Sequence, residues 1–297
     1  MRCDRSEGLP TFYFTLDVEP DYARTNRHAL LDRLPELLSW LRGEAVPLTA
    51  FVVGRYFEEG RDAIDHLLDA GADVGVHGHW HRAADFGTMY SAHTEEIERG
   101  TAAFRRRVGR APKGYRSPSG VISRDDLALL ARLNYCYDAS VFPVRRPGRY
   151  DFSRAPRAPF RWKDSQLLEL PCGLLTRRLP AGMTFLNWVG AGWGGRLLAR
   201  QVVAQRGHQI FDAHLHNLFH SSAALRELPL GLRGAYEAGR VFGGLKCLQA
   251  LVAWMRKSGW RFGSLDALAD ELNRDAGAVP TAGWDEVIVR ATARASA

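Results

Sequence analysis

Short apolar stretches alternate with longer segments of helical periodicity along this chain. Residues 11–16 read Thr-Phe-Tyr-Phe-Thr-Leu, an apolar and β-branched run that is typical of a buried strand. Residues 28–43 carry leucines at helical spacing and end at Gly43. Further strands are predicted over 48–53, 73–76, 114–116, 167–170, 209–215 and 260–262, and further helices over 61–70, 90–108, 123–133, 245–257 and 264–273.

This alternation, repeated about seven times, predicts an α/β fold with a parallel sheet, because parallel strands need helical crossovers. A closed or nearly closed (β/α) barrel fits the pattern. The competing layout is an open doubly wound sheet. It is disfavoured because residues 17–21, Asp-Val-Glu-Pro-Asp, stand where a glycine-rich dinucleotide turn would be needed.

Composition and charge narrow the function classes. The 297 residues are 46% hydrophobic and 25% charged, which is ordinary for a globular enzyme and excludes disorder, collagen and a coiled coil. The net charge of +7 suits an acidic substrate, a phosphate-bearing lipid or an anionic membrane face. Basic residues are scattered apart from 105–107 and 145–163, so we expect no nucleic-acid partner.

The four cysteines are Cys3, Cys136, Cys172 and Cys247, and none forms a CxxC pair. They are interpreted as free thiols in a reducing compartment. Residues 1–7 are polar, with no apolar core of a secretion signal, and a cytoplasmic location is therefore expected. The apolar, glycine-rich stretch 183–198 contains Asn187 and Arg196, so it is not expected to span a bilayer, although peripheral membrane contact stays open.

Polar residues that carry chemistry follow several predicted strands. The strand at 73–76 leads directly into His77-Gly-His79-Trp-His81. Imidazoles four residues apart meet on one face of a helical turn and can share a divalent metal with a carboxylate from another strand. The alternative is a surface histidine cluster. His79 is not expected to share the face of His77 and His81. It is interpreted as a residue behind the site or as an exposed residue.

The first strand ends in Asp17 and Glu19, whose side chains lie on one face because a strand alternates. One carboxylate can bind the metal while the other accepts a proton from water. The strand predicted over 209–215 ends in His214-Leu-His216. His216, the more distal of the two, is predicted to be the general acid for a leaving amine.

With these residues the chain, from about 11 to 272, resembles the NodB-homology polysaccharide deacetylase superfamily. The matching motifs are, in order, Thr-Leu-Asp-Val-Glu (15–19), His-Gly-His-Trp-His (77–81), Arg-Ser-Pro-Ser (116–119), Tyr-Asp-Ala-Ser-Val-Phe-Pro (137–143) and Leu-His (215–216). The resemblance implies a distorted (β/α)7-type barrel. It further implies Asp17 as base, Arg116 to orient that base, Asp138 to tune His216, and a carboxylate with His77 and His81 as metal ligands.

The chain departs from the family pattern in three places. Val18 stands where the usual family has a metal-binding Asp, so Glu19 is assigned as the ligand, as in a D-x-D/E branch of the superfamily. Ser119 replaces an aromatic residue of the third motif. The span from Asp138 to His216 is longer than usual, so we expect a deacetylase domain over 8–274 with an inserted segment at about 144–206, and a weakly packed tail over 275–297.

The inserted segment and the Asp-Val-Glu motif also resemble the branch that acts on lipid-linked amino sugars, including the aminoarabinose deformylase. The loop arginines could meet a sugar phosphate or an anionic lipid, or simply face solvent; they are Arg145, Arg146, Arg149, Arg154 and Arg157. An apolar lip at a membrane interface is a further hypothesis, with core packing as its alternative. Its residues would be Met183, Phe185, Leu186, Trp188 and Trp193.

The sequence therefore predicts a metal-dependent hydrolase that removes an N-acyl group, acetyl first, from an amino sugar that is free, lipid-linked or nucleotide-linked. Zn²⁺ is the expected metal, and Co²⁺, Ni²⁺ or Fe²⁺ would fit the same ligands. The alternatives are a deformylase, a hydrolase of a cyclic imide or ureide, and a sugar-binding barrel without catalysis.

Overall fold

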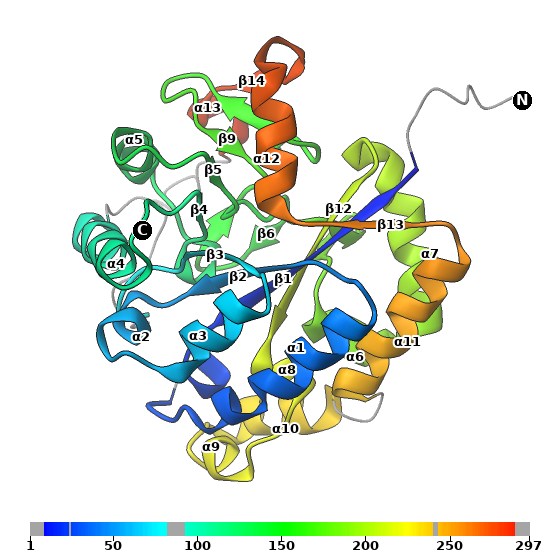
Figure 1. The fold of residues 1–297 in the computed structure, drawn as a ribbon. Coiled ribbons are helices and arrows are strands. Elements are labelled where there is room, and N and C mark those ends of the chain that lie inside the picture. The colour runs from blue at the N-terminus through cyan, green and yellow to red at the C-terminus, as the bar shows by residue number, and fades with distance from the viewer. Residues whose placement is uncertain (1–8, 24, 82–92, 240–242, 289–297) are drawn as a thin grey trace, which may run out of the picture.

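The computed structural model describes residues 9–23, 25–81, 93–239 and 243–288 (Figure 1). A sheet of mostly parallel strands forms its centre, in the order β12-β1-β2-β3-β4-β5-β9-β8-β14, with β13 paired to β1. Neighbours from β12 to β9 are parallel, whereas β8 runs antiparallel to β9. The strands are β1 (Thr11–Val18), β2 (Leu48–Val52), β3 (Asp73–Val76), β4 (Gly114–Tyr115), β5 (Tyr137–Asp138), β8 (Phe160–Trp162), β9 (Leu168–Glu169), β12 (His208–His214), β13 (Arg261–Gly263) and β14 (Thr281–Ala282).

A segment that contains a short hairpin, residues 173–182, links the two ends of the parallel run. Gly173 N donates to the Ile210 carbonyl at 2.8 Å, and Asp212 N donates to the Ala181 carbonyl at 3.0 Å. Residues 173–182 thus connect β9 to β12 without a regular ladder. Seven parallel strands, β12, β1, β2, β3, β4, β5 and β9, make up the wall, so the predicted distorted (β/α)7-type barrel is confirmed.

Helices surround this sheet (Figure 1). They are α1 (Leu34–Gly43), α2 (Gly54–Glu58), α3 (Asp62–Asp69), α4 (Thr94–Val108), α5 (Arg124–Arg132), α6 (Met183–Val189), α7 (Ala191–Gln201), α8 (Leu215–Leu218), α9 (Ser222–Arg226), α10 (Leu230–Gly239), α11 (Gly244–Lys257), α12 (Leu265–Arg274) and α13 (Trp284–Val287). Short 3₁₀ turns lie at Asp21–Ala23, Ala29–Arg33, Pro118–Gly120, Val202–Gln205 and Ala276–Ala278. Two hairpins project from the barrel: β6 (Arg145–Arg146) with β7 (Tyr150–Asp151), and β10 (Leu174–Thr176) with β11 (Leu179–Pro180).

Local sequence accounts for the regular elements. Every residue of β1 after Thr11 is buried, because the strand has side chains of the barrel interior on one face and helices on the other. Helix α5 begins with a capping box in which Ser123 Oγ accepts from Asp126 N and Asp126 Oδ2 accepts from Ser123 N. These elements fall within a few residues of their predicted limits. For the helix expected over 90–108, residues 90–92 lie outside the described residues.

Two expectations about domain organisation need correction. The segment 144–206 is not simply an insertion, because it supplies β9, the seventh parallel strand, and the chain that leads back to β12. The expected tail is also packed as far as residue 288. There β14 pairs with β8, Val287 and Ile288 are buried, and Trp284 lies against Trp162 with ring centroids 5.7 Å apart.

Among the described residues, no helix combines the length and the apolar character that crossing a membrane would require.

Candidate metal centre and active site

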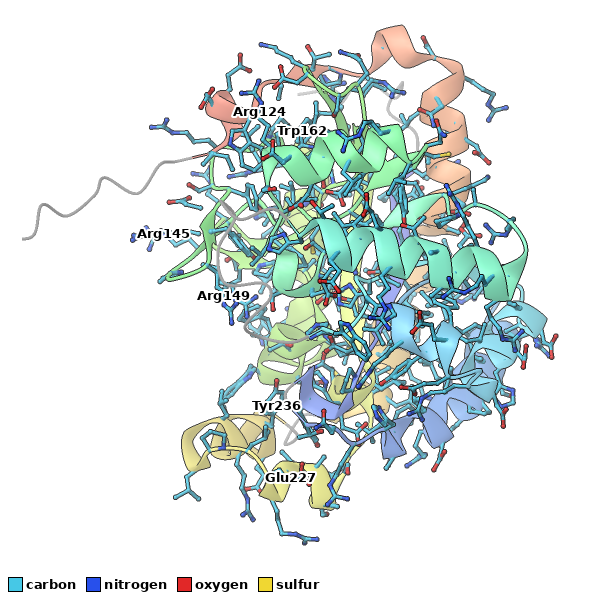
Figure 2. All side chains as sticks on the ribbon, turned by 90° about the vertical axis from the view of Figure 1, so that its left-hand side faces the viewer. Arg124, Arg145, Arg149, Trp162, Glu227 and Tyr236 are labelled. Carbon is cyan, nitrogen blue, oxygen red and sulfur yellow. The ribbon has the colours of Figure 1, made fainter. Side chains whose placement is uncertain are left out.

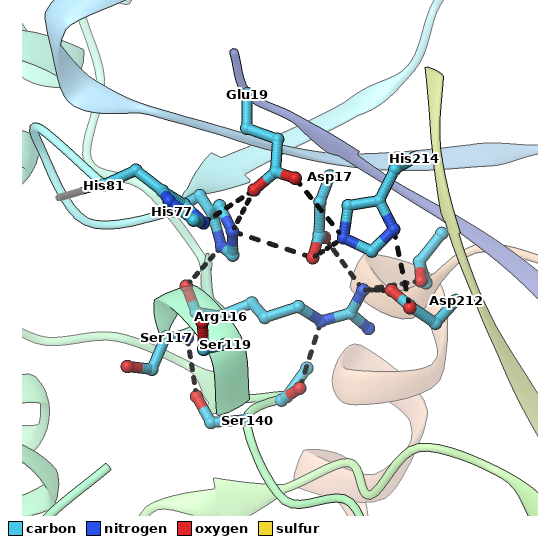
Figure 3. A network of polar contacts seen from close by, with 12 residues as sticks. Asp17, Glu19, His77, His81, Arg116, Ser117, Ser119, Ser140, Asp212 and His214 are labelled. Atoms are coloured by element: carbon cyan, nitrogen blue, oxygen red, sulfur yellow. Dashed lines mark hydrogen bonds and ion pairs between the residues drawn. The ribbon is translucent and has the colours of Figure 1, made fainter. Parts of the chain in front are cut away.

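The carboxyl ends of β1, β3, β4 and β12 bring the candidate residues together (Figure 3). Asp17 pairs in register with His214, and Val76, which precedes His77, pairs with Tyr115, which precedes Arg116. Because parallel strands end at the same edge of the sheet, these side chains share one buried space. Figure 3 shows Asp17 and Glu19 between the two histidines of the β3 loop and His214.

Glu19, His77 and His81 form a buried group whose candidate ligand atoms all lie within 4.8 Å of one another. Glu19 Oε2 is 2.6 Å from His81 Nε2 and 3.5 Å from His77 Nε2. His77 Nδ1 donates to the Arg116 carbonyl at 2.8 Å, which leaves Nε2 as the free ligand atom. That atom and Glu19 Oε1 are buried without a hydrogen-bond partner. Two imidazoles and a carboxylate fit a divalent metal such as Zn²⁺.

The electrostatics agree with a site that binds a cation. Burial by itself would raise the pKa of the Glu19 carboxyl, but His81 and His214 hold it well below its usual range. Burial would likewise lower the pKa of His81, yet Glu19 raises it. Glu19 is thus ionised, as a ligand must be.

The loop after β3 differs from the helical turn that the spacing of the histidines suggested. His81 has φ of +56°, and the rings of His77 and His81 have centroids 5.1 Å apart. Glu96 of α4 holds this loop, accepting from His79 N at 2.6 Å and Trp80 N at 2.9 Å. A non-glycine residue in the left-handed region is uncommon and often marks a functional position.

His79 turns away from the candidate metal group. Its ring is buried, and Nε2 lies 3.4 Å from Glu58 of α2. The interpretation of His79 as an exposed residue is therefore wrong, whereas a place behind the site agrees with the structure.

Arg116 is fully buried and links three strand ends. Its Nη1 donates to Thr15 Oγ1 at 2.8 Å, Asp17 Oδ1 at 3.0 Å and Asp212 Oδ1 at 3.1 Å. Asp17, Asp212 and His214 form a second group with possible ligand atoms close together. This group already holds a cation, the guanidinium. Of the two groups, the one with Glu19 is therefore the better candidate for a metal ion.

The structure places His214, and not His216, against the carboxylates. His214 Nε2 lies 3.7 Å from Asp17 Oδ2 and 3.6 Å from Glu19 Oε1, and Nδ1 donates to Asn217 Oδ1 at 3.1 Å. Although burial lowers the pKa of His214, the carboxylates of Asp212, Glu19 and Asp17 outweigh burial and raise it to about 9. A protonated imidazole is therefore favoured at this position.

His216 lies one layer further out, so the geometry favours His214 over His216 for the predicted role of general acid. Its ring is stacked between His214, at a centroid distance of 4.9 Å, and Tyr22, at 5.1 Å. Burial and the neighbouring His214 lower its pKa to about 3. The alternation of side chains along β12 does not extend to His216, because the strand ends at His214 and α8 begins at Leu215.

The contacts of Asp138 are with Ser140 and Glu169, and they give no support to the prediction that it tunes His216. Asp138 accepts from Ser140 Oγ at 2.6 Å and is hydrogen-bonded to the buried carboxyl of Glu169. Ser140 Oγ in turn accepts from Ser117 N at 2.8 Å, so Asp138 supports the chain beside Arg116. A further carboxylate beside His214 is that of Asp212, whose Oδ2 lies 3.8 Å from His214 Nδ1 and which the sequence motifs did not single out. Its place two residues before His214 on one strand is the signal that could have found it.

These groups open into a cleft of about 440 Å³. Asp17, Glu19, His81, Asp212 and His214 line its floor. Aromatic side chains surround the opening, although Ser119 stands where the third family motif has an aromatic residue. The aromatic residues of the walls are Tyr22, Phe142, Tyr150, Phe185 and Tyr236.

The hypothetical apolar lip is only partly formed. Met183 and Leu186 are completely buried in the core, so their place in the lip is wrong. Phe185 lines the cleft, while Trp188 and Trp193 are 49% and 63% exposed.

Comparisons with known proteins agree with this geometry. Residues 6–137 match the family model described as polysaccharide deacetylase. A structure assigned as a polysaccharide deacetylase from Mycobacterium smegmatis has a TM-score of 0.60 at 18% identity, covering 94% of this chain and 95% of that one. One assigned likewise from Pseudomonas aeruginosa PAO1 gives 0.58 at 14% identity, covering 89% and 91%.

An allantoinase also gives a TM-score of 0.58 at 14% identity, covering 89% of this chain and 90% of that one. At these identities the structures establish the fold alone. No curated protein matches the sequence. The family match covers the strands that carry Asp17, Glu19, His77, His81 and Arg116, and the solved structures of two proteins assigned to polysaccharide deacetylases share the barrel fold.

Proposed function

We propose that the protein is a metal-dependent hydrolase that removes the N-acyl group, acetyl first, from an amino sugar. The observation that carries this proposal is the grouping of Glu19, His77 and His81 beside Asp17 and His214 in one cleft. Glu19, His77 and His81 would hold the ion, with Zn²⁺ the first choice and Co²⁺, Ni²⁺ or Fe²⁺ alternatives. Bound there, a divalent ion polarises the acyl carbonyl and lowers the pKa of water.

The residues of the chain supply the proton transfers. Asp17, held by Arg116, accepts the proton of the attacking water at a carboxylate oxygen. His214, oriented by Asn217 and charged at neutral pH, donates its Nε2 proton to the departing amine. Asp212 lies 3.8 Å from His214 Nδ1 and favours the charged ring.

Hydrolysis of a cyclic ureide is the second candidate, because an allantoinase shares the barrel. Deformylation is a third, since the same groups would release formate. A binding barrel without catalysis is the last, and a protein described as a CE4 family pseudoenzyme from Bacillus anthracis shares the fold at a TM-score of 0.51. It is less well supported, because Glu19 joins the two histidines although Val18 stands at the usual ligand position.

Mass spectrometry of products from the metal-loaded protein separates these candidates. The panel contains N-acetyl and N-formyl amino sugars and a cyclic ureide. Release of acetate and free amino sugar supports the proposal. Turnover of the ureide alone would select the ureide hydrolase, and formate as the preferred product would select the deformylase. No turnover with any compound would select the binding barrel without catalysis.

We also propose that the protein works in the cytoplasm, where an amino-sugar intermediate would be deacylated before export. The free thiols of Cys136, Cys172 and Cys247 support a reducing compartment. Cell fractionation with an antibody to the protein tests this, and recovery only outside the cytoplasmic and membrane-associated fractions would contradict it.

A further inference from the structure

The loop between the two candidate ligand histidines is held by contacts from two helices. It runs from His77 to His81 and contains two residues with positive φ, Gly78 at +65° and His81 at +56°. A residue other than glycine keeps such a backbone only where its surroundings enforce it. The position of the His81 ring beside Glu19 therefore depends on what holds the chain before it.

Helix α2 holds the carbonyl groups of this loop. Gly54 N, at the beginning of the helix, donates to the Gly78 carbonyl at 3.0 Å. Arg55 N donates to the His79 carbonyl at 3.1 Å. The first N–H groups of a helix have no acceptor within it, and the loop supplies one to each of these two. The N–H groups of the loop, at His79 and Trp80, need an acceptor from elsewhere.

Helix α4 supplies that acceptor through Glu96. The helix lies on the face of the molecule that Figure 2 turns toward the viewer, and it packs against α2. The side chain of Glu96 is buried, and its Oε2 accepts from His79 N at 2.6 Å and from Trp80 N at 2.9 Å. The guanidinium of Arg99, about one turn further along α4, lies 4.7 Å from the centre of the Trp80 ring.

The close approach of α4 to the loop depends on Gly100. A Cβ atom at this residue would lie 2.4 Å from the Gly78 carbonyl oxygen, which is too close for any side chain. A Cβ atom at Gly54 would likewise lie 2.6 Å from Gly100 Cα. The loop and the two helices therefore pack backbone against backbone, and Glu96 reaches the loop from a closely packed support.

We propose that Glu96 is a positioning residue of the metal centre. By accepting two consecutive N–H groups, it fixes the backbone just before His81 and so directs that ring toward Glu19 and His77. This inference rests on the proposed function, because it needs the metal group on which that function depends. Glu96 belongs neither to the described metal group nor to the described lining of the cleft, so it acts through the loop alone.

Zinc affinity tests this role without turnover. The metal-free protein is titrated with Zn²⁺ in competition with a chromophoric chelator. We expect Glu96→Ala to bind Zn²⁺ about tenfold or more weakly than the unmodified protein, because residues that orient metal ligands contribute roughly 10- to 100-fold to affinity. Glu96→Gln keeps an acceptor oxygen in the same place and should restore most of the lost affinity.

Thr101→Val is the matched control on the same helix. Thr101 is buried, and its Oγ1 donates to the Ile97 carbonyl at 2.6 Å and lies 2.7 Å from the Tyr135 hydroxyl. Its loss should lower Tm, as the loss of the Glu96 carboxyl does, because buried hydrogen bonds are removed in both. Zn²⁺ affinity should stay unchanged in Thr101→Val. An equal loss of affinity in Thr101→Val and Glu96→Ala would reduce Glu96 to a structural role and overturn the proposal.

The same titration separates this inference from the proposed function. Absence of Zn²⁺ binding in the unmodified protein would refute the metal centre itself. Equally tight binding by the unmodified protein and by Glu96→Ala would refute only the role of Glu96 and retain the metal centre. If Glu96→Ala does not fold, Glu96→Asp, which withdraws the carboxylate by one methylene group, takes its place with the same expected direction.

Discussion

At the residue scale, the division of labour between two neighbouring carboxylates is the main feature of the site. Asp17 and Glu19 come from one strand end and face one space, yet their partners differ. Glu19 contacts His77 and His81, whereas Asp17 contacts Arg116. The guanidinium offsets the charge of Asp17, and we therefore expect Glu19 rather than Asp17 to bind the metal.

Substitution of each carboxylate should therefore have a distinct result. Asp17→Asn should keep the metal but lower kcat by ~10²–10⁴-fold, because an amide oxygen does not accept the proton of water at neutral pH. Glu19→Gln should lose metal. Metal content and kcat measured on the same preparations check both, with the exposed Asp32→Asn as control. Loss of metal in Asp17→Asn with retention in Glu19→Gln would exchange the two roles.

The two histidines after β12 should also differ. His214→Ala should retain metal and lower kcat by ~10²–10⁴-fold through loss of the general acid. His216→Phe preserves an aromatic ring in the stack with Tyr22 and should reduce kcat much less. Steady-state kinetics of both variants on one substrate decide the matter. A larger loss in His216→Phe would restore the original assignment of His216.

At the element scale, a buried carboxyl pair joins β5 to β9 beneath the active site. Asp138 and Glu169 are both completely buried and are hydrogen-bonded to each other. Glu169 also accepts from Val141 N and Trp162 Nε1, each at 3.0 Å. Burial raises the pKa of Asp138 to about 6, and burial together with Asp138 raises the pKa of Glu169 well above its usual range. One shared proton therefore stabilises this pair.

This pair should make stability depend on pH. From about pH 4, where ordinary carboxyls ionise, up to the raised pKa values, the folded chain binds more protons than the unfolded chain. The free energy of unfolding that the pair contributes is therefore present at acidic pH and is lost as pH rises. We expect Tm to fall by roughly a few degrees between pH 5 and 8 for this reason. Glu169→Gln, which keeps a donor toward Asp138, should flatten the profile, and an unchanged slope in that variant would contradict the shared proton.

At the scale of the whole molecule, the sequence predicts the barrel better than it predicts the site. Buried parallel strands are apolar on both faces, so runs such as 11–16 and 73–76 are recognisable without knowledge of their neighbours. Short strands are different. β14 has two residues and lies in the sheet only because it pairs with β8, a long-range contact that local periodicity does not encode.

Among the site residues, too, some can be predicted from local sequence and others cannot. Glu19, His77 and His81 could be grouped from the sequence because Glu19 and His77 each directly follow a strand whose end is evident, and His81 lies four residues after His77. The acid could not be assigned, because the change from strand to helix at residues 214–215 decides which ring faces Asp17. The position of Asp212 depends on the register of β12 against β1. Both depend on tertiary pairing rather than on local pattern.

We predict that one divalent ion binds at Glu19, His77 and His81, and the ratio of metal to chain tests this most directly. Elemental analysis of the purified protein after metal loading and removal of free ion should give one ion per chain. His77→Ala and His81→Ala should each lose it, while His66→Ala, an exposed histidine of α3, should retain it. No bound metal in the unmodified protein, or an undiminished ratio of metal to chain in His77→Ala and His81→Ala, would contradict this metal site.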